Sequence, residues 1–236
     1  MMPATKQAAQ LGQRDLAITL LALLSVLAWD FSGLDLPLAR LFGSADGFHL
    51  REAWLTSHLL HEGGRGLAWL LLIWQGLHAF ALKPLPLTPP RRERRYWLGV
   101  AIASIVFVPA LKRVTMSSCP WELSEFGGVA SYVPHWLLGV YDGGPGHCFP
   151  SGHAIAAFGF FGLYFLWRPY RPVLARTLLG LVLAAGALFG LAQMARGAHY
   201  LSHILWTGLI CWTFCVLADL NTRRRARAIL AGQAAD

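Results

Sequence analysis

The sequence predicts an all-α, polytopic membrane protein: a bundle of six transmembrane helices with one amphipathic helix lying at the membrane interface. Two observations carry this prediction. First, 56% of the 236 residues are hydrophobic and only 14% are charged, and the mean hydropathy is +0.47, which is too apolar for an ordinary soluble domain. Second, the chain contains six apolar stretches that are long enough to cross a bilayer, which takes roughly 17 to 25 residues.

The six stretches cover residues 16–33, 65–82, 97–113, 152–168, 174–197 and 202–220. Lys6 and Arg14 precede the first stretch, as they would in a signal peptide, but no small-residue cleavage site follows it, so we expect a retained helix. The sequence shows no internal repeat and no sign of a second domain. Residues 1–236 are therefore predicted to form a single membrane-embedded domain.

The lysines and arginines predict the orientation of the bundle. They concentrate in the N-terminal tail, between the second and third stretches, between the fourth and fifth, and at the C-terminus. If six helices alternate, these four segments lie on one side of the membrane, which the positive-inside rule makes cytoplasmic. We therefore expect a bacterial inner-membrane protein with both termini in the cytoplasm. The net charge of +8 follows from this topology and requires no nucleic-acid partner, although it favours anionic lipids.

The opposite, periplasmic side carries two longer connections, residues 34–64 and 114–151. In the first, Phe48 to Leu60 is predicted to form an amphipathic helix that lies flat in the headgroup region of the bilayer. Its His58 and His61 are interpreted as interfacial residues, with metal binding as the minor alternative.

The four cysteines fall into two pairs. Cys119 and Cys148 flank the second periplasmic connection, where an oxidising compartment favours a disulfide that closes the loop. Cys211 and Cys215 lie four residues apart in the last apolar stretch, and we expect them to be small packing residues.

Ionisable residues gather where three predicted helices meet the periplasmic face. Lys112 ends the third stretch, His153 opens the fourth, and Arg196 and His199 end the fifth. Each residue alone would be explained by its closeness to the interface. Their convergence on one membrane face instead predicts a site for phosphate chemistry at a lipid surface.

The start of the fourth stretch has the pattern of an anion site. Ser151 follows a proline and is expected to cap the helix, so that the backbone N–H groups of residues 151–153 point outward from a helix N-terminus. Gly152 would let a phosphate oxygen approach the backbone closely.

The end of the fifth stretch supplies complementary groups. Arg196, His199 and His203 are spaced three and four residues apart, which would place them on one face of a helix. An arginine can form two hydrogen bonds to a phosphoryl group. One histidine can attack phosphorus, while its neighbour holds the attacking ring in the required tautomer.

Residues 112–206 resemble the signature of the type-2 phosphatidic acid phosphatase superfamily of membrane phosphatases. This signature has three motifs in order: Lys-x6-Arg-Pro, Pro-Ser-Gly-His and Ser-Arg-x5-His-x3-Asp. The middle motif is intact at residues 150–153. In the first motif, Lys112 is followed at the correct distance by Cys119 and Pro120, so that a cysteine stands where the family has arginine.

The third motif departs further from the family pattern. Aligning His199 with the family histidine places Gln193 at the arginine position and His203 at the aspartate position. Arg196, one helical turn nearer to His199, would restore the missing positive charge. In an alternative register His203 is the nucleophile and Thr207 takes the place of the aspartate.

The resemblance implies a mechanism for each matched residue. His199 would attack the phosphoryl group and form a phosphohistidine, while His153 would protonate the leaving group and then take a proton from water. His203 would orient His199. The phosphate oxygens would be bound by Lys112, Ser151, Gly152 and Arg196. The resemblance implies no metal and no other cofactor.

The implied function is hydrolysis of a lipid phosphomonoester or diphosphate at the periplasmic face. The substrate class includes phosphatidate, phosphatidylglycerol phosphate, undecaprenyl diphosphate and lipid A. Two alternatives remain open: a phosphotransferase that passes the phosphoryl group to another lipid through the same site, and a transporter or scaffold with a degenerate, non-catalytic site. The sequence leaves the particular lipid and the oligomeric state undetermined.

Overall fold

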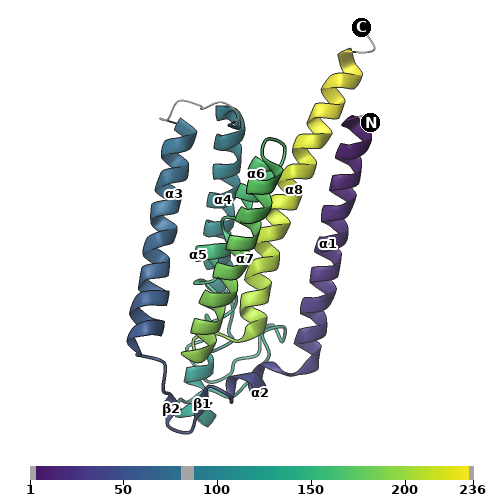
Figure 1. Ribbon diagram of the computed structural model, residues 1–236. Helices are drawn as coiled ribbons and strands as arrows, with labels where there is room; N and C mark the ends of the chain where they lie inside the picture. Colours follow the sequence, from purple (N-terminus) through teal and green to yellow (C-terminus); the bar gives the residue numbers. More distant parts are fainter. Residues whose placement is uncertain (1–3, 81–87, 234–236) are drawn as a thin grey trace.

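The computed structural model describes residues 4–80 and 88–233, and these are almost entirely helical. The long elements stand side by side in one bundle (Figure 1). They are α1 (Ala4–Ser32), α3 (Gly64–Phe80), α4 (Arg91–Lys112), the pair α5 (Ile155–Phe158) and α6 (Gly162–Trp167), α7 (Pro172–Ala195) and α8 (Leu201–Gln233). The short elements are α2 (Asp35–Ala39), the hairpin β1 (Gly43–Ser44) and β2 (Gly47–Phe48), the π-helix η1 (Leu55–Gly63) and the 3-10 turns η2 (Pro120–Glu122) and η3 (Ser124–Phe126).

Four helical segments are long and apolar enough to cross a membrane: Gln10–Ser32, Arg91–Lys112, Pro172–Ala195 and Leu201–Arg225. The helix α3 has only 17 residues, and Ile155–Trp167 forms a shorter apolar segment. The predicted helical membrane protein is thus supported by four candidate spans, whereas the number of six spans stays a prediction.

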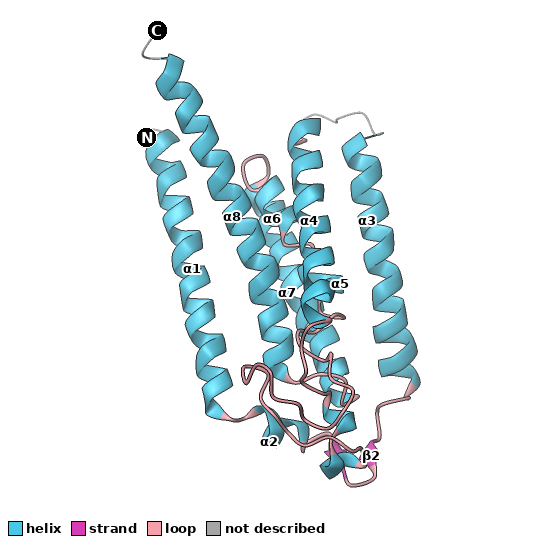
Figure 2. Ribbon diagram, turned by 180° about the vertical axis from the view of Figure 1, so that it is seen from behind, coloured by secondary structure: helices cyan, strands magenta, loops and turns pink. Residues whose placement is uncertain are grey.

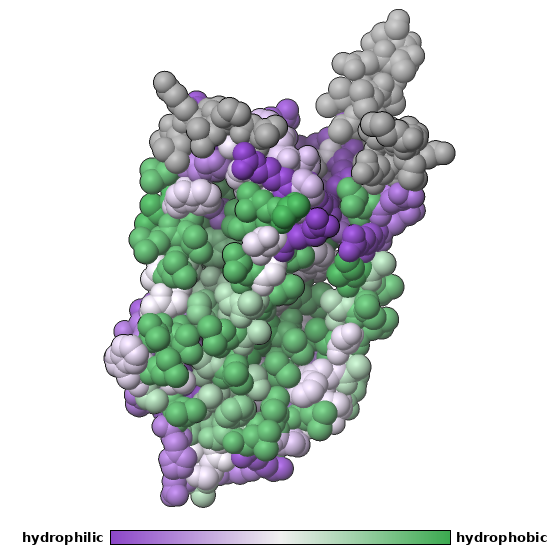
Figure 3. All heavy atoms as spheres, in the orientation of Figure 1, coloured by the Kyte–Doolittle hydropathy of each residue, from purple (hydrophilic) through white to green (hydrophobic). Residues whose placement is uncertain are grey.

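The two ends of the bundle differ in character. The N-terminal end of α1 and the C-terminal end of α8 lie at one end, while α2, the hairpin and the long connection after α4 gather at the other (Figures 1 and 2). Between the ends, one face of the molecule carries a broad band of hydrophobic side chains (Figure 3). An apolar surface of this kind suits contact with lipid acyl chains.

The fourth predicted stretch is not one continuous helix. It is divided into α5 and α6, and residues between them make backbone bonds of the i to i+3 type, such as Phe160 N–H to the Ala157 carbonyl at 3.1 Å. The helix thus tightens locally, as a 3-10 turn does. Close packing accompanies this segment: a Cβ at Gly186 of α7 would lie 2.1 Å from the Phe158 ring, so only glycine permits this approach.

The amphipathic helix predicted from Phe48 to Leu60 is wrong in its bounds and partners. Phe48 ends the hairpin and is buried at 6% exposure against Phe126, with ring centroids 4.9 Å apart. The hydrophobic Phe48 side chain therefore packs in an interior cluster and not at a membrane surface. Helical structure begins at Leu55, as the π-helix η1, and runs directly into α3. The alternation of apolar and polar residues could not distinguish these two uses.

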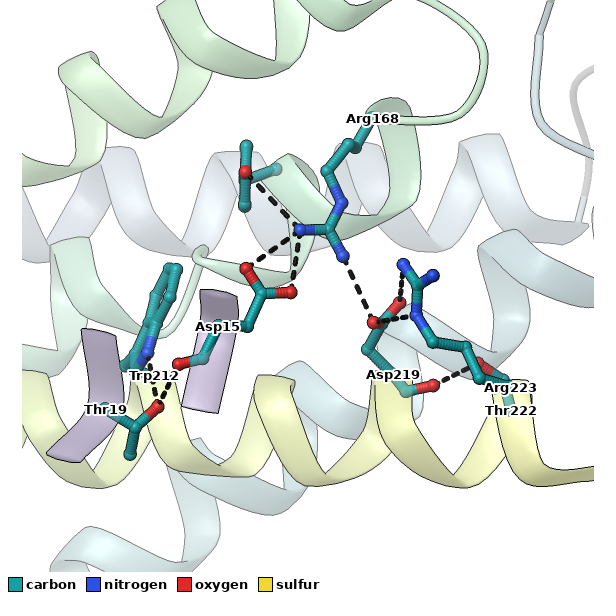
Figure 4. Close-up of polar contacts among 8 residues, drawn as sticks. Asp15, Thr19, Arg168, Trp212, Asp219, Thr222 and Arg223 are labelled. Carbon is teal, nitrogen blue, oxygen red and sulfur yellow. Dashed lines mark hydrogen bonds and ion pairs between the residues drawn. The ribbon is translucent and has the colours of Figure 1, made fainter. Parts of the chain in front are cut away.

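A buried ion network joins three helices near the end opposite to the long connections (Figure 4). Arg168 follows α6 and donates to both carboxylate oxygens of Asp15 in α1, at 3.0 and 2.8 Å, and to Asp219 of α8 at 3.1 Å. Asp219 also accepts a bond from Arg223 at 2.5 Å. Arg168 is only 9% exposed. The network therefore ties α1 to α6 and α8 through groups that require one another to remain charged in the interior.

Candidate active site

One cavity of about 310 Å³ brings together most of the residues that the sequence singled out. It lies where η1, the start of α3, the ends of α4 and α7, and the segment before α5 converge. Its lining residues are His61, Arg65, Lys112, Cys119, Trp121, Gly152, His153, Gln193, Arg196, Ala198 and His199. A larger cavity of about 430 Å³, lined mainly by apolar residues of the connection after α4, contains no lysine or arginine. The smaller cavity is therefore the candidate phosphate site.

His199 lies in the turn between α7 and α8 and is 6% exposed. Its Nδ1 is 3.5 Å from Sγ of Cys148. Because a disulfide sulfur carries no hydrogen, this contact requires Nδ1–H to donate, which leaves the lone pair on Nε2. Burial lowers the pKa of His199 well below 6.5, and the positive charge of Lys112 adds to the shift. The ring is thus neutral at pH 7 and able to act as a nucleophile.

A tight turn, and not a helix, presents Arg196 and His199. The helix α7 ends at Ala195, and Gly197 has a φ of 73°, a left-handed conformation that favours glycine. The Gly197 carbonyl accepts a bond from Trp121 N–H at 2.9 Å. The predicted sharing of one helical face by residues 196, 199 and 203 is therefore wrong, although Arg196 and His199 do line the same cavity.

His153 is held by a hydrogen bond to the π-helix η1, which lies far from it in the chain. Its Nε2 lies 3.2 Å from the Leu60 carbonyl, which accepts the Nε2–H bond and leaves the Nδ1 lone pair available. The ring of His61 lies against that of His153, with centroids 4.3 Å apart. Burial lowers the pKa of His153 to about 4, and the neighbouring His61 contributes to the shift.

Three cations line the cavity: Arg65, Lys112 and Arg196. Among the side chains that the structure describes, in residues 10–80 and 88–225, none of the three forms a direct salt bridge. Glu52 and Glu62 nevertheless interact electrostatically with Arg196, and Glu122 interacts with Lys112. Arg196 donates its Nε–H to the Arg51 carbonyl at 2.8 Å, which fixes the guanidinium while the other nitrogens stay available. Three cations without a direct ion pair around one cavity are a pattern that favours an anionic ligand.

Ser151 is not placed as predicted. The helix α5 begins at Ile155 and not at Ser151, and the Ser151 N–H donates to the His203 carbonyl at 3.1 Å. Ser151 is completely buried and does not line the cavity. Gly152 does line it, and a Cβ there would meet only Lys112 Cδ, at 4.0 Å. The predicted helix N-terminal anion site is therefore wrong, and the positive charge of the cavity comes from the side chains of Arg65, Lys112 and Arg196.

His203 packs against His199 but does not line the cavity. It is 1% exposed, and its ring centroid is 5.8 Å from that of His199 in an edge-to-face contact. No hydrogen bond joins these two described side chains, and His203 Nδ1 has no partner. This geometry favours His199 over His203 as the nucleophile. His203 is thus a packing partner of His199 and is not hydrogen-bonded to it.

Cys119 and Cys148 form a disulfide with their Cα atoms 5.2 Å apart. The bond joins the turn η2 to the segment that precedes Ser151, and one of its sulfurs contacts His199. These two cysteines and His199 are also the one close group of potential metal ligands in the described part of the chain. Because both sulfurs are oxidised, the group offers no thiolate, and its donor set does not suit a metal ion.

Sequence reasoning missed three lining residues: His61, Arg65 and Trp121. His61 and Arg65 belong to η1 and α3, some fifty residues before Lys112. Their only sequence signal was that His61 and Arg65 lie four positions apart on the predicted periplasmic side. Position along the chain gave no indication that they would face His153.

A sequence profile of the PAP2 superfamily matches residues 95–226, which is more than half of the chain. The match includes every motif residue from Lys112 to His203 and excludes η1 and α3. No curated protein and no solved structure shows significant similarity to the chain.

Proposed function

The chain belongs to the PAP2 superfamily, and from this premise we propose that it is an integral membrane lipid phosphatase that works through a phosphohistidine intermediate. The proposal depends mainly on one observation: a neutral, buried His199 lines the same cavity as His153 and three cations that form no direct ion pair among the described side chains. Nucleophile, proton carrier and charge stabilisation are the parts that phosphoryl transfer requires.

In the first half of the reaction, Nε2 of His199 attacks phosphorus, and the bond from phosphorus to the leaving oxygen breaks. His153 in its protonated form donates Nδ1–H to that oxygen. Lys112, Arg196 and Arg65 stabilise the negative charge on the phosphoryl oxygens, which is where most of the catalysis is expected to arise. The Nδ1–H contact with the disulfide sulfur keeps the attacking lone pair on Nε2.

In the second half, water attacks phosphorus and the nitrogen–phosphorus bond breaks. His153, again neutral, takes the proton from water at Nδ1, and His199 recovers its lone pair. Inorganic phosphate is released and both histidines return to their starting states.

We also place this site at the periplasmic face of a bacterial inner membrane. Support comes from the distribution of arginines, which concentrate at the end of the bundle opposite to the cavity. The disulfide at the cavity wall suits an oxidising compartment.

Purified protein in detergent is expected to release inorganic phosphate from lipid phosphates and diphosphates, because the cavity binds the phosphoryl group and not the lipid tail. The measurement is phosphate release from a panel of both lipid types, with radiolabelled donor in the presence and absence of an unlabelled acceptor lipid. Transfer of label to the acceptor without phosphate release would instead identify a phosphotransferase. No turnover in either format would contradict the proposal.

The acid limb of kcat/KM is expected below about pH 6. Nε2 of His199 must be unprotonated to attack, and burial lowers its pKa well below 6.5, so the reactive form persists as the pH falls through 6.5. His153 donates its proton in the first half of the reaction and accepts one in the second, so its pKa of about 4 adds no acid limb above about pH 4. A pH–rate profile between pH 4.5 and 8, with the ionisation of the substrate titrated separately, measures the limb. A limb centred at or above 6.5 would contradict this assignment.

A further inference from the structure

We propose that reduction of the Cys119–Cys148 disulfide creates a binding site for a divalent cation of the zinc class, made of the two thiolates and Nδ1 of His199. The bound cation would inactivate the nucleophile, so the inhibitory effect rests on the proposed phosphatase function, whereas the binding of the cation does not. Only the reduced protein has this site, because the sulfurs of a disulfide offer no thiolate.

The three ligand atoms already lie close together. The two sulfurs and a ring nitrogen of His199 lie within 4.8 Å of one another, and Nδ1 is 3.5 Å from Sγ of Cys148. In a tetrahedral site, Zn–S bonds of about 2.3 Å and Zn–N bonds of about 2.0 Å place neighbouring ligand atoms roughly 3.5 to 3.8 Å apart. The nitrogen–sulfur distance therefore suits a metal ion without change, and reduction needs only to let the two sulfurs separate.

Backbone hydrogen bonds hold these ligands together independently of the disulfide. The N–H of Cys148 donates to the Ser117 carbonyl at 2.9 Å. The N–H of Trp121, two residues after Cys119 in the turn η2, donates to the Gly197 carbonyl at 2.9 Å. This second bond ties η2 to the turn that presents the nucleophile. The three ligands are therefore expected to stay close to one another after the sulfur–sulfur bond is broken.

The site can be reached from the cavity. Cys119 and His199 line the cavity, whereas Cys148 is completely buried. A reductant and a metal ion can therefore approach on the side of the Cys119 sulfur. Lys112 lines the same cavity, and a neighbouring cation favours a thiolate over a thiol. The charge around the site thus supports the form of cysteine that binds a metal.

A dithiol reductant supplies the two electrons that open the disulfide. Its first thiolate attacks Sγ of Cys119, and the sulfur–sulfur bond breaks with its electron pair on Sγ of Cys148. The second sulfur of the reductant then displaces Cys119 and leaves as a cyclic disulfide, which produces two protein thiols. Binding of the cation releases both thiol protons to solvent. The fourth coordination position stays open to water or to a phosphate oxygen in the cavity.

The cation would inactivate His199 by changing its tautomer. In the oxidised protein Nδ1–H faces a disulfide sulfur, so the lone pair on Nε2 is free to attack phosphorus. A metal ion on Nδ1 uses the lone pair of that nitrogen, and the ring proton moves to Nε2. The attacking atom then has no lone pair. Reduction without a metal has a smaller effect, because the Cys148 thiol can either donate to Nδ1 or accept from it.

The test measures phosphate release and metal binding by the protein in detergent, either oxidised or reduced with a dithiol that is then removed. Zn²⁺ should lower phosphate release by the reduced protein roughly tenfold or more, and should change release by the oxidised protein less than about twofold. Co²⁺ should give thiolate-to-cobalt charge-transfer absorption, with about one equivalent bound, only after reduction. Removal of the metal with a chelator, followed by reoxidation, should restore phosphate release.

Two variants locate the metal. His199→Ala keeps both thiols and should weaken Co²⁺ binding to the reduced protein at least about tenfold, because one of three ligands is lost. The matched control is Cys211→Ser with Cys215→Ser, which removes the free, buried cysteines of α8 that do not line the cavity. This control should bind Co²⁺ and lose activity with Zn²⁺ as the unmodified protein does.

Three results would overturn the metal site: a dithiol that leaves the disulfide intact in the folded protein, a reduced protein without charge-transfer absorption, or phosphate release by the reduced protein that Zn²⁺ does not change. Absorption that disappears in the α8 control would place the metal on those cysteines and would also overturn it. A reduced protein that binds Co²⁺ but releases no phosphate in any redox state would instead contradict the phosphatase function, while the metal site would stand.

Discussion

Replacing His199 with alanine is expected to reduce phosphate release roughly a thousandfold or more, with little change in the amount of folded protein. The reason is that the imidazole Nε2 of His199 forms the covalent intermediate in the proposed mechanism, whereas His153, another neutral ring of the cavity, is assigned to proton transfer. The measurement is phosphate release from a lipid phosphate, together with trapping of a labelled protein intermediate from radiolabelled substrate. The label should be absent from His199→Ala.

Two further histidine variants make this result specific. His203→Ala is expected to weaken release without abolishing it, because His203 packs against His199 but does not line the cavity. His49→Ala should have no effect, since His49 is exposed at the same end of the molecule. If His203→Ala removed the labelled intermediate while His199→Ala retained it, the assignment of the nucleophile would be reversed.

Much of the cavity could be predicted because the informative residues sit at predicted helix ends. Lys112, His153 and His199 were expected to meet at one face of the bundle, and they do line one cavity. Apolar length predicts where a helix crosses the membrane, and therefore which end each terminal residue occupies. Alternation of helices then brings residues from distant parts of the chain to the same side.

The predictions that were wrong concern backbone geometry, which the spacing of apolar residues in the sequence does not indicate. Ser151 was expected to cap a helix, yet its N–H is bonded to the His203 carbonyl and the helix begins at Ile155. The turn at Gly197 replaces a predicted helical continuation. In both places a tertiary contact accompanies the change: Ser151 is bonded to His203 of α8, and Gly197 is bonded to Trp121 of η2. Such contacts override the local preference for a cap or a helix.

The contribution of η1 and α3 could not be inferred from the motifs at all. In a π-helix, backbone bonds span five residues, and such segments often occur at functional sites. Here the π-helix directs the Leu60 carbonyl to His153 and places His61 against the same ring. The first part of the chain therefore contacts His153 directly, although the superfamily match begins only at residue 95.

The ion network at the other end of the bundle leads to a stability prediction of comparable size. Arg168→Met is expected to destabilise the protein by about 3 to 5 kcal/mol, because it removes the partner of a buried carboxylate. Asp15 receives both of its ion-pair bonds from Arg168, whereas Asp219 keeps Arg223. The measurement is the unfolding midpoint in detergent, followed by intrinsic tryptophan fluorescence.

Arg176→Met is the control for this variant, because Arg176 is an exposed arginine on the neighbouring helix α7 and its loss should change the midpoint little. The double variant Asp15→Asn with Arg168→Met should recover most of the lost stability, since it removes the carboxylate that Arg168 leaves unpaired. No residue of the network lines the cavity, so protein that remains folded should retain its specific activity. A midpoint unchanged by Arg168→Met would show that water reaches Asp15 and that the network does not hold α1 in place.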